Sequence, residues 1–78
     1  MKFSPLQRTL HYLSTHGPSN VQAEAIEILG QSDLPECFPS FPRWSRESLL
    51  RRLSENSKKS ARVRLEALKD LLAILAHR

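Results

Sequence analysis

Residues 46–75 read RESLLRRLSENSKKSARVRLEALKDLLAIL, and this stretch decides the fold class. Its second half places apolar residues at alternating steps of four and three, the spacing of one face of an α-helix. Asn56 and Ser57 interrupt the pattern, because polar residues of this kind favour the ends of helices. The stretch therefore predicts two helices, over residues 46–55 and 58–77. The residues expected to face inward are Leu49, Leu50 and Leu53 in the first helix and Ala61, Leu65, Leu68, Leu72 and Leu75 in the second.

The N-terminal part of the chain predicts two further helices, over residues 5–16 and 19–29. Gly17 and Pro18 separate them, because glycine takes the left-handed cap conformation and proline cannot continue a helix. Gly30 is expected to end the second helix as its C-cap. No alternating β-branched run indicates a strand, so we expect one all-α, four-helix domain over residues 1–78. Each of the two helices starts at a Ser-x-x-Gln capping box, Ser4 to Gln7 and Ser19 to Gln22.

Residues 31–43 differ in composition from the rest of the chain, since three prolines there preclude a continuous helix. The segment also contains Phe38 and Phe41, and Trp44 follows directly after it. We expect an ordered loop whose rings lie on the core, because large aromatic side chains are usually buried. The alternative is an exposed proline–aromatic patch that binds a protein partner.

Charge is distributed unevenly along the 78 residues, which have a formal net charge of +4. Residues 1–42 contain two basic and four acidic residues, whereas residues 43–78 contain ten basic and four acidic ones. The net charges of −2 and +6 favour an anionic partner for the second half, and double-stranded DNA is the partner we expect. The alternative is a basic face that serves solubility and ion pairing on the helix surface. The predicted nucleic-acid-binding residues are Arg43, Arg46, Arg51, Arg52, Lys58, Lys59, Arg62 and Arg64.

The sequence contains no motif typical of an enzyme: neither a phosphate-binding loop, nor a zinc-protease helix, nor a nucleophile elbow. We therefore expect a non-enzymatic protein with no cofactor, no bound metal and no small-molecule substrate. No apolar run reaches the roughly 20 residues of a membrane span, so no membrane partner is expected. The single cysteine, Cys37, rules out an internal disulfide and favours a reduced, cytoplasmic compartment.

A helical protein-interaction adaptor or inhibitor is the second functional interpretation. The apolar stripe of the last helix is wide, and a core of this size often needs help from a partner. We expect a homodimer, or else capture of another protein, through the end of this helix and the aromatic patch. The predicted contact residues are Phe38, Phe41, Trp44, Leu71, Leu72, Ile74 and Leu75.

Two stretches of the chain resemble known families. Residues 10–30, LHYLSTHGPSNVQAEAIEILG, look like the first two helices of helix-turn-helix regulators. Residues 46–75 resemble the segment after the DNA-binding region in small terminase subunits of tailed phages, which ends in an R-x-x-A-L-x-x-L assembly helix. The matching residues are Arg64, Ala67, Leu68 and Leu71. These resemblances imply a DNA-associated regulatory protein of phage or mobile-element origin.

Overall fold

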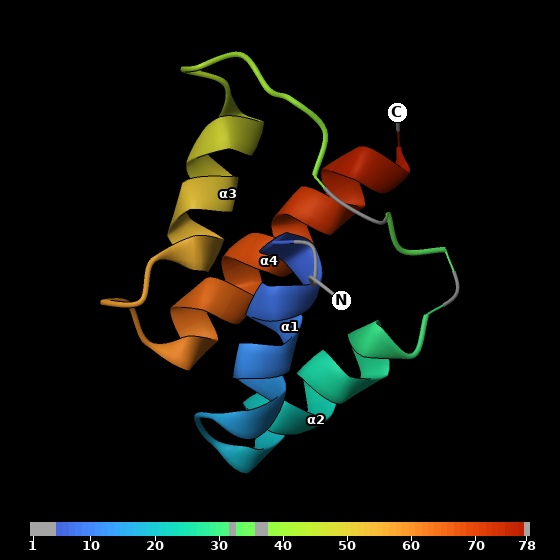
Figure 1. Cartoon of the computed structure of the whole chain (residues 1–78), viewed down its shortest axis with the longest axis vertical. Helices are drawn as coiled ribbons and strands as arrows, with labels where there is room; N and C mark the ends of the chain where they lie inside the picture. Colours follow the sequence, from blue (N-terminus) through green and yellow to red (C-terminus); the bar gives the residue numbers. More distant parts are fainter. Residues whose placement is uncertain (1–4, 32, 36–37, 78) are drawn as a thin grey trace. The chain divides into compact units, whose positions relative to one another are not determined.

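The computed structural model of the chain describes residues 5–31, 33–35 and 38–77, and this part contains four α-helices and no strand (Figure 1). The all-α prediction is therefore confirmed. The helices are α1 (Pro5–Thr15), α2 (Ser19–Leu29), α3 (Arg46–Glu55) and α4 (Ala61–Ala76). Two predicted features, the Ser4 cap of the first helix and the surroundings of Cys37, lie outside the described residues.

The chain divides into two compact units, Met1–Pro39 and Ser40–Arg78. In the first unit α1 packs against α2, and in the second unit α3 packs against α4. Each unit is thus a pair of helices that are neighbours in sequence, as short connections between antiparallel helices favour. The expectation of a single domain over residues 1–78 stays a prediction.

The prediction that Gly17 takes the left-handed conformation between α1 and α2 is confirmed, since its φ is 92°. The predicted capping box at the start of α2 is wrong. Pro18, not Ser19, occupies the N-cap position, in an extended conformation and without a side-chain cap. Ser19 is already helical, and Gln22 turns its side-chain amide back to donate a 3.0 Å hydrogen bond to the Gly17 carbonyl oxygen.

The second unit begins its helices with serine caps. The Ser45 hydroxyl accepts a hydrogen bond from the Ser48 N–H, and α3 spans the predicted range. The predicted start of the last helix at residue 58 is wrong, because α4 begins at Ala61 behind the N-cap Ser60. The residues before Ser60 form a turn on Asn56, whose side-chain oxygen accepts from the Lys58 N–H at 3.0 Å.

The apolar stripe of α4 is buried at its centre and half-buried toward its C-terminal end. On α3, in contrast, the predicted inward position of Leu49 is wrong, since this side chain is 51 % exposed. The fully buried side chain of α3 is Ser54, and five residues of helix place Leu49 about 140° away from it. The fully buried leucines of the chain are Leu6, Leu10, Leu13, Leu65, Leu68 and Leu71.

The aromatic residues around the proline-rich loop do not share one environment. Phe38 is buried, as the core-lid interpretation expects, and Phe41 is half-buried. For Trp44 the core-lid interpretation is wrong, because 75 % of this residue is exposed. Trp44 lies in a turn directly before α3 that hydrogen bonds from Ser45 to the Pro42 carbonyl oxygen close.

Among the described residues, the structure has no helix of the length and apolar character that crossing a membrane requires.

Candidate nucleic-acid interface

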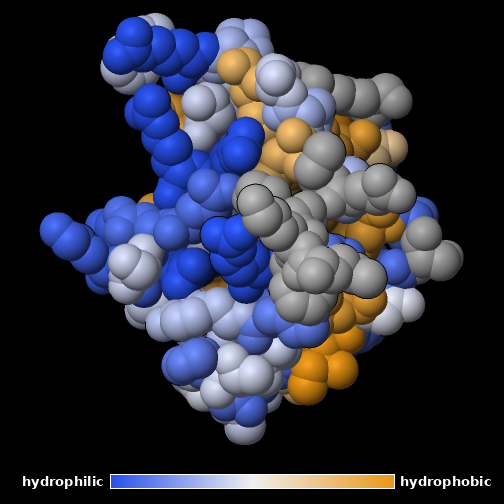
Figure 2. Space-filling model, in the orientation of Figure 1, coloured by the Kyte–Doolittle hydropathy of each residue, from blue (hydrophilic) through white to orange (hydrophobic). Residues whose placement is uncertain are grey.

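Exposed cations accompany α3 over its whole length. Arg43 and Arg46 lie at its N-terminal end, Arg52 lies two turns further, and Lys58 and Lys59 lie in the turn that follows it. Ten helical residues span about 15 Å, a length along which one strand of a duplex places roughly four phosphates. Figure 2 shows strongly hydrophilic side chains gathered over the region where Figure 1 places α3 and this turn.

These five cations are available to a ligand. Among the described residues, none of the five forms an ion pair with an acidic side chain. Each is also exposed, so the charge is hydrated and faces solvent. Clustered, unneutralised Arg and Lys side chains of this kind are the electrostatic footprint of a surface that binds a phosphate backbone.

Two other predicted nucleic-acid-binding residues are ion-paired. Arg51 Nε lies 3.3 Å from Glu55 Oε1 on α3, and Arg62 lies 3.3 Å from Glu66 on α4. Both pairs join residues four positions apart on one helix, and all four side chains are at least one-third exposed. Because exposed ion pairs of this kind are weak, a phosphate can replace the carboxylate as the partner of either arginine. The ion pair is then lost, a cost in free energy that the five unpaired cations do not have.

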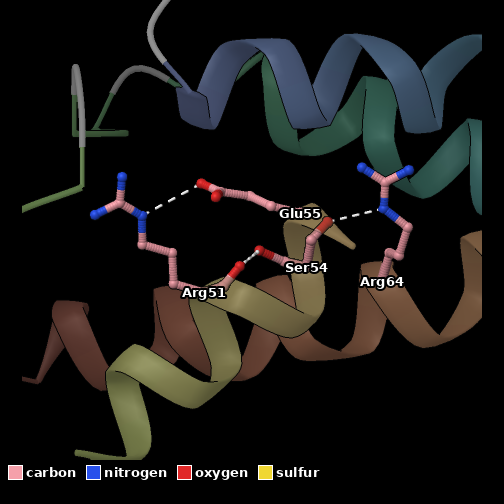
Figure 3. A network of polar contacts seen from close by, with 4 residues as sticks. All are labelled: Arg51, Ser54, Glu55 and Arg64. Atoms are coloured by element: carbon pink, nitrogen blue, oxygen red, sulfur yellow. Dashed lines mark hydrogen bonds and ion pairs between the residues drawn. The ribbon is translucent and has the colours of Figure 1, made fainter. Parts of the chain in front are cut away.

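Arg64 has a structural position rather than one on the exposed surface. It is only 5 % exposed, and its Nε donates a 2.8 Å hydrogen bond to the Ser54 carbonyl oxygen (Figure 3). The Ser54 hydroxyl in turn donates to the Arg51 carbonyl oxygen at 2.8 Å. The bond from Arg64 satisfies one of the four carbonyls that the last turn of a helix leaves without an intrahelical partner. Arg64 therefore fastens the end of α3 to α4.

Trp44 lies within the group of cations. The guanidinium carbon of Arg43 is 5.5 Å from the centroid of the Trp44 ring, and that of Arg52 is 5.9 Å from it. Both distances are within the range of a cation–π contact. The sequence predicts Trp44 on the core or, alternatively, in a protein contact, and the two arginines at nucleic acid, whereas the structure brings all three together.

The signal that this cluster leaves in the sequence is weak. Trp44 is adjacent to Arg43, but Arg52 is eight residues away and comes near only because residues 46–52 are helical. Ser45, the N-cap that follows Trp44, marks the place where the helix begins and the side chain before it is free to project. A tryptophan directly before an N-cap serine, with arginines on the following helix, is the pattern that locates the cluster.

The predicted partner contacts do not gather in one exposed patch. Phe38 and Leu71 are buried, whereas Trp44 is exposed. The remaining four are half-buried: Phe41, Leu72, Ile74 and Leu75.

No protein-family model matches the chain, and no curated protein and no solved structure is significantly similar to it. The resemblances to helix-turn-helix regulators and to small terminase subunits therefore stay predictions.

Proposed function

We propose that the protein is a non-enzymatic nucleic-acid-binding module that contacts the phosphate backbone through α3 and the turn after it. The observation that supports this proposal is a group of five exposed cations, free of ion pairs to the described residues, of which two lie on α3 and three lie in the turns that flank it. Each cation that neutralises a phosphate releases a counterion, so binding is strongest at low salt. Contacts of this kind position the protein without reading sequence.

A second candidate function is binding to a protein through the same side of α3. Leu49 and Trp44 are both large, apolar and mostly exposed, and an exposed apolar group rimmed by charge is typical of interaction surfaces. The charge around them argues for the first candidate, because α3 and its flanking turns offer five cations that form no ion pair with the described residues: Arg43, Arg46, Arg52, Lys58 and Lys59.

The test compares two variants with the same change in net charge. Lys58→Gln/Lys59→Gln removes two charges from the candidate interface, and Arg8→Gln/Lys69→Gln removes two exposed charges elsewhere. Binding to a labelled mixed-sequence DNA of about 20 nucleotides, as a single strand and as a duplex, is followed by anisotropy at several salt concentrations. We expect the first variant to lower the slope of log K against log salt by about 1.4 to 1.8, and the control to leave it unchanged.

Equal losses from both variants would mean that net charge alone drives binding, which overturns the assignment to α3. Absence of binding by the unmodified chain at low salt overturns the proposed function and leaves the protein-binding candidate.

A further inference from the structure

The ring of Trp44 is held in place although it is exposed. The Ser45 N–H and the Ser45 hydroxyl both donate to the Pro42 carbonyl oxygen, at 3.0 and 2.8 Å, which closes a turn over residues 42–45. The same hydroxyl accepts from the Ser48 N–H and so joins this turn to α3. The backbone of Trp44 thus belongs to a hydrogen-bonded helix start, and its side chain projects from it.

The guanidinium groups of Arg43, from the turn, and of Arg52, from the helix, lie over the ring, with their carbons 5.5 and 5.9 Å from its centroid. These contacts orient the ring, yet three-quarters of the residue stays open to solvent. An indole is among the largest apolar groups a protein has, and it is usually mostly buried. Trp44 is therefore an exposed aromatic side chain with two guanidinium groups in contact with its ring.

The ligand that fits this cluster has a flat aromatic face next to an anion. A nucleotide has both, because its base stacks on an indole and its phosphate accepts hydrogen bonds from guanidinium groups. In a duplex, however, each base face is already covered by the neighbouring base pair, and opening the stack costs free energy. Only an unpaired base offers its face to Trp44 without that cost.

We infer that Trp44, flanked by Arg43 and Arg52, is a stacking site for an unpaired nucleobase, and that the module prefers single-stranded to double-stranded nucleic acid. This inference rests on the proposed function and specifies its ligand. It also revises the expectation of duplex DNA, since the cations along α3 bind either form whereas the ring distinguishes between them.

The experiment measures binding of the unmodified chain, Trp44→Leu and Trp44→Phe to the labelled single strand and to the same strand annealed to its complement. Trp44→Leu keeps an apolar side chain but removes the aromatic face, and Trp44→Phe keeps a smaller one. We expect Trp44→Leu to weaken single-strand binding by about tenfold to a hundredfold, with duplex binding changed by less than about twofold. Trp44→Phe should retain most of the affinity.

A second readout reports on the ring itself. Trp44 is the single tryptophan of the chain, so its emission should be quenched when the unlabelled single strand binds and not when the duplex binds. Thermal melting of Trp44→Leu checks folding, and an exposed ring predicts a midpoint like that of the unmodified chain.

Equal weakening of single-strand and duplex binding in Trp44→Leu, or an unquenched tryptophan in the single-strand complex, would overturn the stacking site. If the unmodified chain binds both forms equally and still depends on Lys58 and Lys59, this inference fails while the proposed function stands. If it binds neither form at low salt, the proposed function fails first.

Discussion

Arg62 and Arg64 are two positions apart in the sequence, yet their environments are opposite. Arg62 is half exposed and pairs with Glu66, whereas Arg64 is buried and donates to the Ser54 carbonyl oxygen. The two-residue step turns the helix by about 200°, so neighbouring charges of one sign serve different purposes. At the scale of the residue, the number of basic side chains in a segment is therefore a poor measure of its available charge.

Replacing each of these two arginines by methionine should separate the two roles. Arg64→Met keeps a long unbranched side chain but leaves the buried Ser54 carbonyl without this donor, so we expect a loss of about 1–3 kcal/mol in the free energy of unfolding. Arg62→Met removes a half-exposed ion pair with Glu66 and should cost about 1 kcal/mol or less. Urea denaturation followed by circular dichroism measures both, and identical midpoints would contradict the structural role of Arg64.

Burial at single positions was the part of the structure least accessible from the sequence. Leu49 was expected inside and Trp44 on the core, and both are exposed. Periodicity reports that a helix has an apolar face, but which residues of a short helix face inward depends on how the helix is rotated against its neighbour. The rotation of α3 buries Ser54 fully, and because serine is polar, the hydropathy pattern does not predict this position as buried.

At the scale of the element, local stop and start signals predict most helix boundaries, but the start of α4 behind the Ser60 cap is an exception. The ends of α3 follow from Ser45 and Asn56, and the end of α1 follows from Gly17. The start of α4 was placed too early because Lys58 and Lys59 favour helix. The hydrogen bond from the Lys58 N–H to the Asn56 side chain holds them in a turn instead.

The two glycines that end helices should respond differently to alanine. Gly17 has a φ of 92°, which an alanine adopts only with strain, so Gly17→Ala should destabilise the protein by about 1–2 kcal/mol. Gly30 has a φ of −78°, and a Cβ there meets only the carbonyl oxygens of Glu27 and Ile26 at 3.5 and 3.7 Å, which is ordinary contact.

Gly30→Ala should therefore be neutral or should stabilise the protein by up to about 1 kcal/mol, because alanine restricts the unfolded chain. Thermal denaturation of the pair measures the difference. A midpoint for Gly17→Ala equal to that of the unmodified chain would show that the turn between α1 and α2 does not require the left-handed conformation.

At the scale of the whole molecule, the fold class followed from the sequence, whereas the candidate site followed only in part. Eight basic residues were expected to bind together, and the structure leaves five of them exposed and without ion pairs to the described residues. The association of Trp44 with Arg43 and Arg52 depends on where α3 begins and on the side-chain conformations of the three residues.

Self-association through the end of α4 is tested at this scale as well. Leu72, Ile74 and Leu75 are half-buried, so they retain apolar surface for a second copy of the chain. We predict a homodimer at micromolar concentration, and Leu75→Asp should shift it to monomer and lower its melting temperature, because the carboxylate would be desolvated in the contact. Ala73→Asp adds the same charge at an exposed position of the same helix and should leave the dimer intact.

Light scattering over a range of concentrations measures both variants. A concentration-independent monomer mass for the unmodified chain would contradict the dimer and assign this apolar surface to the interior of one chain.

The pairing of helices that are neighbours in sequence also affects how fast the chain folds. Residues 16–18 connect α1 to α2, and residues 56–60 connect α3 to α4, so each pair meets after closure of a very short loop. Loops of about ten residues close in roughly 10–100 ns, and helical proteins dominated by local contacts fold in microseconds to milliseconds. Each helical pair is thus expected to assemble rapidly after dilution from denaturant, before slower steps such as proline isomerisation.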